Sequence, residues 1–194
     1  MDSAIAVIVG IGLAASCGFR VFVPLLVCSV AAKAGYLELA DGFQWIGNWA
    51  ALAAFAVAAT VEVAAYYVPW LDNLLDTIAS PAGMIAGVVL FAASVTELDP
   101  FLRWSLAVIA GGGAAGIVQG GTVVTRVAST ASSGGFANFA VSTLELAAGF
   151  IFSVLAIVVP VVGLILLIVA VFAMYFVGRS VVRALFSRQG ITRQ

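Results

Sequence analysis

The sequence predicts an all-α integral membrane protein with about six transmembrane helices. Its 194 residues are 64% hydrophobic and only 9% charged, and the mean hydropathy is +1.22. A soluble domain is about 45–50% apolar and about 25% charged, so a soluble fold of this length could not bury so much apolar surface. The apolar runs are continuous and do not alternate with a period of two residues, which favours helices over the strands of an outer-membrane barrel.

Six apolar segments come close to the roughly 20 residues that a helix needs to cross the hydrocarbon core. They cover residues 3–30, 45–68, 78–95, 101–118, 139–159 and 161–177. Polar segments at 33–44, 72–77, 96–100 and 119–133 separate most of them. Only Pro160 divides the last two, so a single bent helix there is an open alternative.

The two halves of the chain, 1–98 and 99–185, share short motifs. Thr60-Val-Glu62-Val-Ala-Ala is matched by Thr143-Leu-Glu145-Leu-Ala-Ala, and Ala-Val-Ile at 6–8 recurs at 107–109. Three spans per half would make the second half enter the membrane from the opposite side, as in inverted-repeat transporters. Chance similarity between apolar segments of low complexity is the alternative explanation.

Basic residues predict the orientation, because cytoplasmic loops carry an excess of Lys and Arg. The basic tail at 186–194 places the C-terminus in the cytoplasm, and six spans then place the N-terminus there too. We expect a multi-pass protein of the bacterial inner membrane. The cytoplasmic side would hold Arg126, Arg179, Arg183, Arg188 and Arg193, and the outer side Lys33 and Arg103.

Arg20 lies inside the first apolar stretch, in Cys17-Gly-Phe-Arg-Val-Phe-Val-Pro24. A straight helix over 3–30 would be about 42 Å long, against a hydrocarbon core of about 30 Å. Gly18 and Pro24 therefore predict a broken first helix with Arg20 at the break. A guanidinium at a helix end suits a carboxylate or a phosphate. The alternative is that Arg20 reaches the outer headgroups or pairs with an acid.

Two carboxylates, Glu62 and Glu145, fall inside predicted spans. An ionised group at mid-membrane costs about 2.5–3.5 kcal/mol on insertion scales, so it usually faces a cavity or a partner. One interpretation is a proton or cation site. The other is structural, with each Glu paired to an Arg or reaching the headgroups.

Arg126 is the candidate counterpart of Arg20 in the second half, and would form a gate on the opposite face. It precedes a run of small hydroxyl residues that ends in Gly134-Gly135, and exposed backbone N–H groups beside a cation suit an anion or a lipid phosphate. An ordinary cytoplasmic loop is the favoured alternative. Gln119 either lines a pathway or marks the cytoplasmic end of its span.

A short interfacial helix is expected over 69–80, with Asp72 and Asp76 on its polar face. Two carboxylates four residues apart can jointly hold a cation such as Mg²⁺, although a solvated face is the favoured explanation. Ladders of small residues indicate close helix packing, which drives association in lipid. These ladders are Gly112, Gly116 and Gly120, and Gly10, Ala14 and Gly18.

Composition also narrows the chemistry. There is no His and there are only two Cys, which excludes His-dependent triads, imidazole metal sites and a disulfide framework. No nucleophile-and-base arrangement is visible either, so we expect no enzyme activity, no metal and no cofactor. An enzyme that acts on lipid-linked substrates, with a metal held by Asp72 and Asp76, is the third alternative. The net charge of −1 gives no reason to expect a nucleic-acid partner, and the expected partner is the lipid bilayer.

Three groups of short motifs can be compared with a known family. They are Gly18-Phe-Arg20…Pro24, Glu62…Pro69-Trp-Leu-Asp72…Asp76, and Arg126…Ser-Ser-Gly-Gly-Phe-Ala-Asn138…Ser142-Thr-Leu-Glu145. Together they resemble an uncharacterised bacterial membrane protein family, the domain of unknown function 4126. The resemblance covers most of the chain and implies a membrane protein without implying an activity.

The expected function is that of a small transporter or channel for an ion, a small anionic solute or a lipid. Arg20 and Arg126 would attract the anionic group, while Glu62 and Glu145 couple a proton or balance charge. A membrane-embedded substrate-binding or assembly subunit of a larger complex is the alternative, and a homo-oligomer fits either role. The four side chains would serve function if they face one polar cavity, and would be scaffold if they pair off in dry protein.

Overall fold

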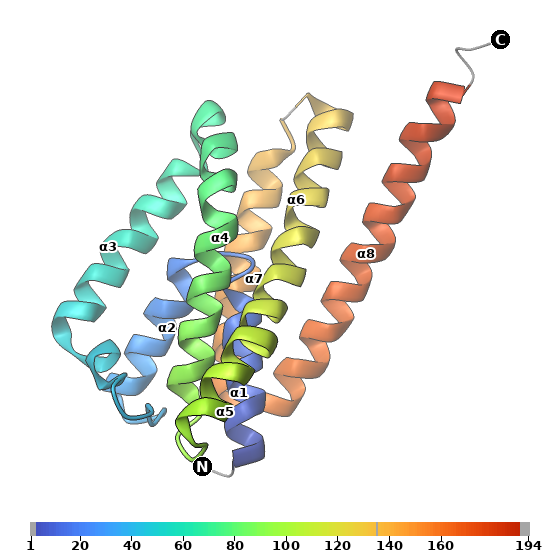
Figure 1. Ribbon diagram of the computed structural model, residues 1–194. Coiled ribbons are helices and arrows are strands. Elements are labelled where there is room, and N and C mark those ends of the chain that lie inside the picture. The colour runs from blue at the N-terminus through green and yellow to red at the C-terminus, as the bar shows by residue number, and fades with distance from the viewer. Residues whose placement is uncertain (1–2, 135, 191–194) are drawn as a thin grey trace.

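A computed structural model describes residues 3–134 and 136–190, without the side chains at 69–76, 78, 132, 181–182 and 184–190. Every regular element in these ranges is a helix, which confirms the predicted class (Figure 1). The elements are α1 Ser3–Ser16, α2 Phe22–Lys33, η1 Gln44–Gly47, α3 Trp49–Ala65, α4 Pro69–Ser94, α5 Pro100–Leu106, η2 Ala107–Gly112, α6 Gly113–Ser133, α7 Asn138–Val158 and α8 Pro160–Gly190.

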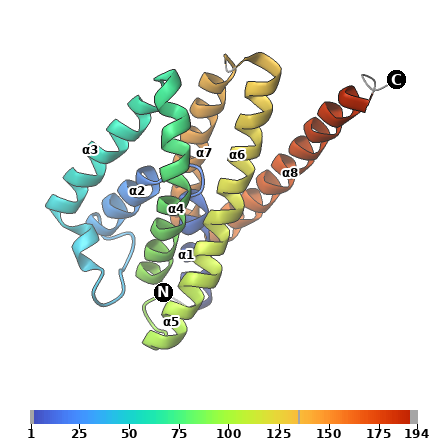
Figure 2. The ribbon, with the colours of Figure 1, turned by 45° about the horizontal axis from the view of Figure 1, so that its top comes forward.

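The predicted break in the first helix falls between α1 and α2, but the chain then turns back. Ser3 Oγ donates to the Glu97 carboxylate, and the Ala40 amide donates to the Ala93 carbonyl at 2.8 Å. The start of α1 and the segment after α2 therefore lie at the same end of α4 (Figures 1 and 2). Each half-helix is about 18–21 Å long at 1.5 Å per residue, and together α1 and α2 form a short helical hairpin.

The remaining helices run back and forth between two ends of the bundle (Figures 1 and 2). We call the end holding 34–48 and 95–99 the loop end, and the end holding 66–68, 134 and 136–137 the tail end. Helices α3 and α6 run toward the tail end, and α4 and α7 run toward the loop end. Helix α8 returns to the tail end, so α1 begins and α8 ends at opposite ends of the bundle, and the expectation that both termini share one side lacks support.

The polar segment 119–133, predicted as a loop, is helical and belongs to α6. Three of its hydroxyl groups bond to carbonyls of the preceding helical turn and so need no water as a partner. Thr122, Thr125 and Ser133 donate to the carbonyls of Gln119, Gly121 and Ser129 at 2.8, 2.9 and 2.7 Å. Because of this local bonding, the polar composition of 119–133 is compatible with a helix, and the prediction of a loop there was wrong.

One further boundary differs from the expected one, and one is confirmed. The segment 69–80 is continuous with the following span, so α4 runs for 26 residues with Pro81 in its interior. As predicted, Pro160 separates α7 from α8, which are two distinct helices and not one bent helix. Proline suits the first turn of a helix because its missing N–H would have no intrahelical partner there.

The six-span prediction is not confirmed. Three stretches of the described residues are long and apolar enough to cross a membrane: 100–131, 138–158 and 160–180. Shorter apolar helices cover 3–16, 22–33, 49–65 and 79–94. The inverted repeat is not confirmed either, because the first parts of the two halves differ. The first half begins with the hairpin of α1 and α2, whereas the second half begins with one continuous helical stretch, α5–η2–α6.

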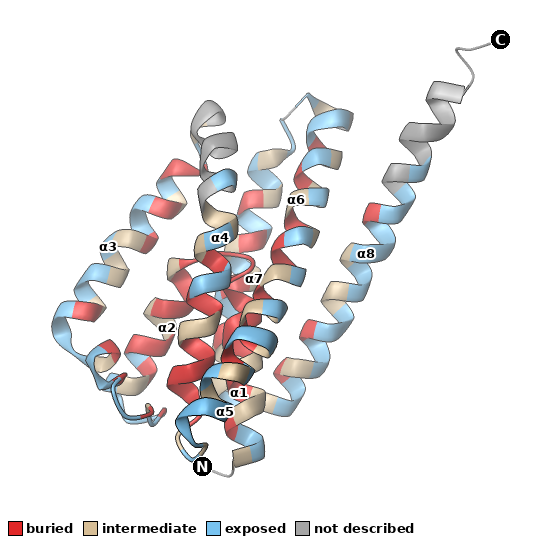
Figure 3. Ribbon diagram, in the orientation of Figure 1, coloured by how far each residue is buried: buried red, intermediate tan, exposed pale blue. Residues whose placement is uncertain are grey.

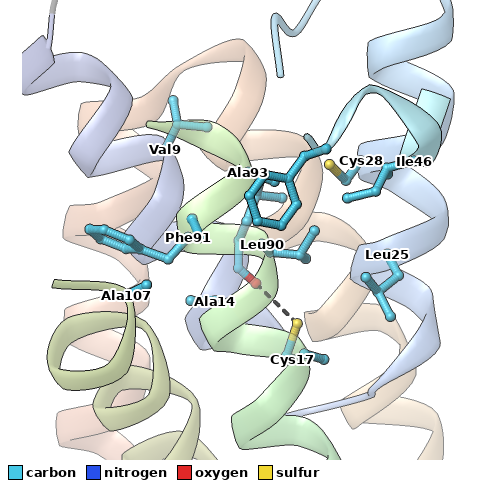
Figure 4. Packing of buried hydrophobic residues seen from close by; sticks show 14 of the residues in the cluster. Val9, Ala14, Cys17, Leu25, Cys28, Ile46, Leu90, Phe91, Ala93 and Ala107 are labelled. Carbon is cyan, nitrogen blue, oxygen red and sulfur yellow. Dashed lines mark hydrogen bonds between the residues drawn. The ribbon is translucent and has the colours of Figure 1, made fainter. Parts of the chain in front are cut away.

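The main core lies around the hairpin and the loop-end half of α4, whereas α8 is largely exposed (Figure 3). Leu90, Phe91 and Ala93 of α4 lie among residues of both half-helices, including Cys17 and Cys28 (Figure 4). The hairpin is thus a central element enclosed by protein.

Candidate anion site at the hairpin tip

The tip of the hairpin, residues 17–21, packs directly against α6. A Cβ atom on Gly18 would lie 2.6 Å from Cβ of Val118 and 2.8 Å from the amide nitrogen of Gln119. Side-chain Cβ atoms do not come so close to other atoms, so only glycine fits this position. The contact brings Arg20, two residues further along, toward α6 and α7.

Arg20 and Arg126 converge on one carboxylate, that of Glu145. Arg126 donates from Nε to Oε1 of Glu145 at 3.0 Å and from Nη2 to Oε2. Nη2 of Arg20 lies 3.5 Å from the same Oε2. The exposed fractions of Arg20, Arg126 and Glu145 are 2%, 5% and 6%, so this charge cluster is enclosed by protein.

Ser142 and Tyr66 complete the surroundings of the two guanidinium groups. Nη2 of Arg20 donates to the Ser142 carbonyl at 2.8 Å, and Nη2 of Arg126 bonds to the Ser142 hydroxyl at 3.1 Å. The guanidinium carbons of Arg20 and Arg126 lie 3.7 and 4.6 Å from the centroid of the Tyr66 ring. Such cation–π contacts stabilise cations away from water.

Glu62 caps the N-terminus of α2. Its Oε1 and Oε2 accept hydrogen bonds from the amides of Val21 and Phe22 at 2.8 and 3.0 Å. A carboxylate there satisfies amides that the helix leaves unpaired and interacts favourably with the helix dipole. Among the described residues, the hydrogen bonds of the Glu62 carboxylate therefore stabilise the start of α2 and do not join it to an arginine.

Arg20 retains unused hydrogen-bonding capacity. Its Nε and Nη1 are buried and have no hydrogen-bond partner among the described residues. Buried donors normally find partners, because leaving one unsatisfied costs about 1–3 kcal/mol and more when the group is charged. The two guanidinium groups and the carboxylates of Glu145 and Glu62 balance in formal charge, so what the tip offers to a further anion is the unpaired donors of Arg20.

A cavity of about 750 Å³ adjoins the tip. Its walls are mostly apolar residues of α3 and α4, and they include Val21, Phe22, Glu62 and Tyr66. The same Tyr66 ring that contacts both guanidinium groups therefore also lines the cavity. A small solute in this cavity would lie beside the charge cluster.

Arg20 and Arg126 do not form gates on opposite faces, contrary to the expectation for two repeats. Both contact the same carboxylate, because Arg126 is in α6 and the hairpin returns Arg20 to the interior. The favoured interpretation of Arg126 as part of a cytoplasmic loop is wrong for the same reason. Its neighbours are helical and its side chain is buried.

Gln119 does not bond to the charge cluster in the part of the chain that the structure describes. Gln119 is buried, and its Nε2 donates to Ser80 Oγ at 3.4 Å, where α6 meets α4 beside the tip. Asp72 and Asp76 belong to α4, but their side chains lie outside the described residues. The cation-site hypothesis therefore stays a prediction.

The glycines singled out for packing have different surroundings. A Cβ on Gly10 would lie 3.1 Å from Phe91, one on Gly112 3.1 Å from Val88, and one on Gly116 3.2 Å from Met84. These three, like Gly18, allow helices to approach closely. A Cβ on Gly120 would meet nothing within 4 Å, so Gly120 does not belong to a packing ladder.

Sequence reasoning missed Tyr66 and Ser142. Helical spacing contained a signal for both, because residues three or four positions apart share a helix face. Tyr66 follows Glu62 by four positions, and Ser142 precedes Glu145 by three. Polar or aromatic neighbours at these spacings are the ones that reach the same interior space.

Comparison with known proteins identifies the family. No curated protein and no solved structure matches the chain. The family described as Domain of unknown function (DUF4126) matches residues 7–180, a range that includes the hairpin, the charge cluster and most of α8. The chain belongs to this family.

Proposed function

We propose that this protein is a small membrane transporter or channel that binds an anionic solute at the hairpin tip. The observation that carries the proposal is the buried Arg20, whose Nε and Nη1 have no partner among the described residues. Free donors of this kind bind carboxylate or phosphate oxygens in charge-assisted hydrogen bonds.

The position of the tip supports a transport role. Many transporters bind substrates where discontinuous helices end inside the membrane, because half-helix termini present free backbone groups there. Here α1 ends and α2 begins beside a cavity of about 750 Å³. Within the proposal, solute oxygens bind Arg20 while the remainder of the solute occupies the cavity against Tyr66.

Two internal carboxylates would compete with the solute. Glu145 is shared between Arg20 and Arg126, and Glu62 accepts from the first amides of α2. Protonation of either carboxylate would remove its charge and free donors for the solute. This competition is the means by which the proposal couples an anion to a proton.

We also propose an orientation at a bacterial inner membrane. The positive-inside rule places the tail end, with Arg179 and Arg183, at the cytoplasm. The loop end, which carries Glu38, Asp41, Glu97 and Asp99, then faces outward. Since α1 begins at the loop end, this orientation places the start of α1 on the outer side and the end of α8 on the cytoplasmic side. Within the proposal, the pair α3–α4 is related by inversion to the pair α7–α8, because α3 runs opposite to α7 and α4 runs opposite to α8 (Figure 1).

Flux measurements in reconstituted vesicles test the function. Purified protein is incorporated into vesicles, and entry of chloride, acetate and inorganic phosphate is measured separately. Arg20→Met and Glu62→Gln are expected to reduce flux at least tenfold while the protein still elutes as a folded species. Lys33→Met is the matched control, because Lys33 lies at the loop end and contacts Trp49 rather than the cluster.

Flux that survives both substitutions would show that the cluster is scaffold and would overturn the proposal. Absence of flux with all three anions, together with stable co-purification of other subunits, would instead favour the alternative of a substrate-binding or assembly subunit. A variant that fails to fold is replaced by Arg20→Lys, which keeps the charge but offers fewer donors.

A further inference from the structure

A second concave region lies between α6 and α8, at the edge of the bundle. This groove has a volume of about 660 Å³ and is lined almost entirely by apolar side chains. On α8 it extends from Val171 to Arg183, about 18 Å along the helix axis at 1.5 Å per residue. Such dimensions suit a long, narrow, apolar ligand.

Two arginines form one end of the groove. Arg179 and Arg183 both line it, and they share a face of α8 because they are four positions apart. Neither forms an ion pair with another side chain in the part of the chain that the structure describes. Arg179 is the last residue but one of the apolar stretch 160–180 of α8, and Arg183 follows that stretch by three positions. Both therefore lie where a membrane span would meet the headgroup region.

The floor of the groove is open because of a glycine. Gly120 lines the groove, and a Cβ atom placed on it would meet no other heavy atom within 4 Å. Gly121 beside it is in contact with Met174, and Gly178 with Val124, so α6 and α8 touch at those points. Gly120 therefore provides space between the helices where a side chain would otherwise project.

We propose that this groove binds one anionic phospholipid, with an acyl chain along Gly120 and the phosphate at Arg179 and Arg183. Apolar walls ending in two free cations match the chemistry of such a lipid at both ends, and basic pockets between transmembrane helices are known to bind anionic headgroups. The site is separate from the hairpin tip and does not depend on the transport proposal.

Thermal unfolding in detergent tests the site. Phosphatidylglycerol or phosphatidylcholine with identical acyl chains is added to the purified protein, and the melting temperature is recorded. We expect phosphatidylglycerol to raise the melting temperature by several degrees and phosphatidylcholine to raise it by less than half as much. Arg179→Ala/Arg183→Ala is expected to abolish the difference between the two lipids.

Gly120→Leu tests the acyl-chain portion. The Cβ atom of the new side chain meets no existing atom within 4 Å, and leucine favours a helix over glycine by up to about 1 kcal/mol. The melting temperature of the lipid-free protein should therefore not fall, while the shift with phosphatidylglycerol falls at least twofold. Gly113→Leu is the matched control, since Gly113 is also free of contacts within 4 Å and does not line the groove. Equal shifts with both lipids, or a full phosphatidylglycerol shift in Gly120→Leu, would overturn the proposal.

Discussion

The hairpin half-helix α1 and the final helix α8 are both strongly apolar, yet they occupy opposite environments. Most of α1 is buried, with small residues such as Gly10, Gly12 and Ala14 against its neighbours. Helix α8 exposes large side chains such as Ile165, Phe172 and Phe176. Because lipid is as apolar as leucine, hydropathy does not separate these helices, and side-chain size does.

The same comparison applies to charge. The hairpin tip brings together Arg20, Glu62, Arg126 and Glu145, all buried, whereas Arg179 and Arg183 on α8 are exposed. Buried ion pairs are costly to break because the remaining charge stays out of water. Truncation of an exposed arginine costs the protein little stability. Substitutions should therefore have large effects around the tip and small effects on α8.

The largest effect is expected for Glu145→Ala. Removing this carboxylate leaves two buried guanidinium groups without their shared partner, which should cost about 3–5 kcal/mol of stability. Arg179→Ala, an exposed charge on α8, should change stability by less than about 0.5 kcal/mol. Unfolding of both variants by titration with dodecyl sulfate measures the difference, and similar midpoints would contradict the contrast between the two regions.

Gly18→Leu should have the next largest effect. The added side chain would collide with Val118 and the backbone of α6, and overpacking of this kind costs about 1–3 kcal/mol. The matched substitution Gly120→Leu places its Cβ atom in open space and replaces a glycine inside a helix, so it should not lower the unfolding midpoint. If both variants unfold alike, the tip does not pack against α6 as described.

Glu62→Ala should have a smaller effect than either change. It removes the carboxylate that accepts from the Val21 and Phe22 amides, and loss of a helix N-cap costs about 0.5–2 kcal/mol. Hydrogen exchange at the start of α2 should accelerate in this variant. Unchanged protection of those amides would show that Glu62 does not stabilise the half-helix.

The smallest effect is expected for Val169→Ala on α8. Its side chain is 59% exposed, and surface substitutions usually change stability by less than about 0.5 kcal/mol. The melting temperature should match that of the unmodified protein. A marked loss would reveal that this face of α8 is covered by a second chain, as in the homo-oligomer considered from the sequence.

The sequence predicted the helical class, the break near Gly18 and the charged residues worth testing. Those inferences depend on local properties: apolar run length, glycine and proline positions, and the scarcity of charges. The helical segment 119–133 escaped prediction, because small hydroxyl residues can satisfy their own polar groups within a helix. Polar composition alone therefore could not separate loop from span.

The sequence by itself determined that this chain belongs in lipid, since so many apolar residues exclude a soluble fold. Only the tertiary structure decided that the first apolar stretch returns on itself and that Arg20 and Arg126 share Glu145. The direction of a chain after a break depends on what it packs against, here the close contact of Gly18 with α6. That contact joins residues about a hundred positions apart, a distance over which no local pattern carries information.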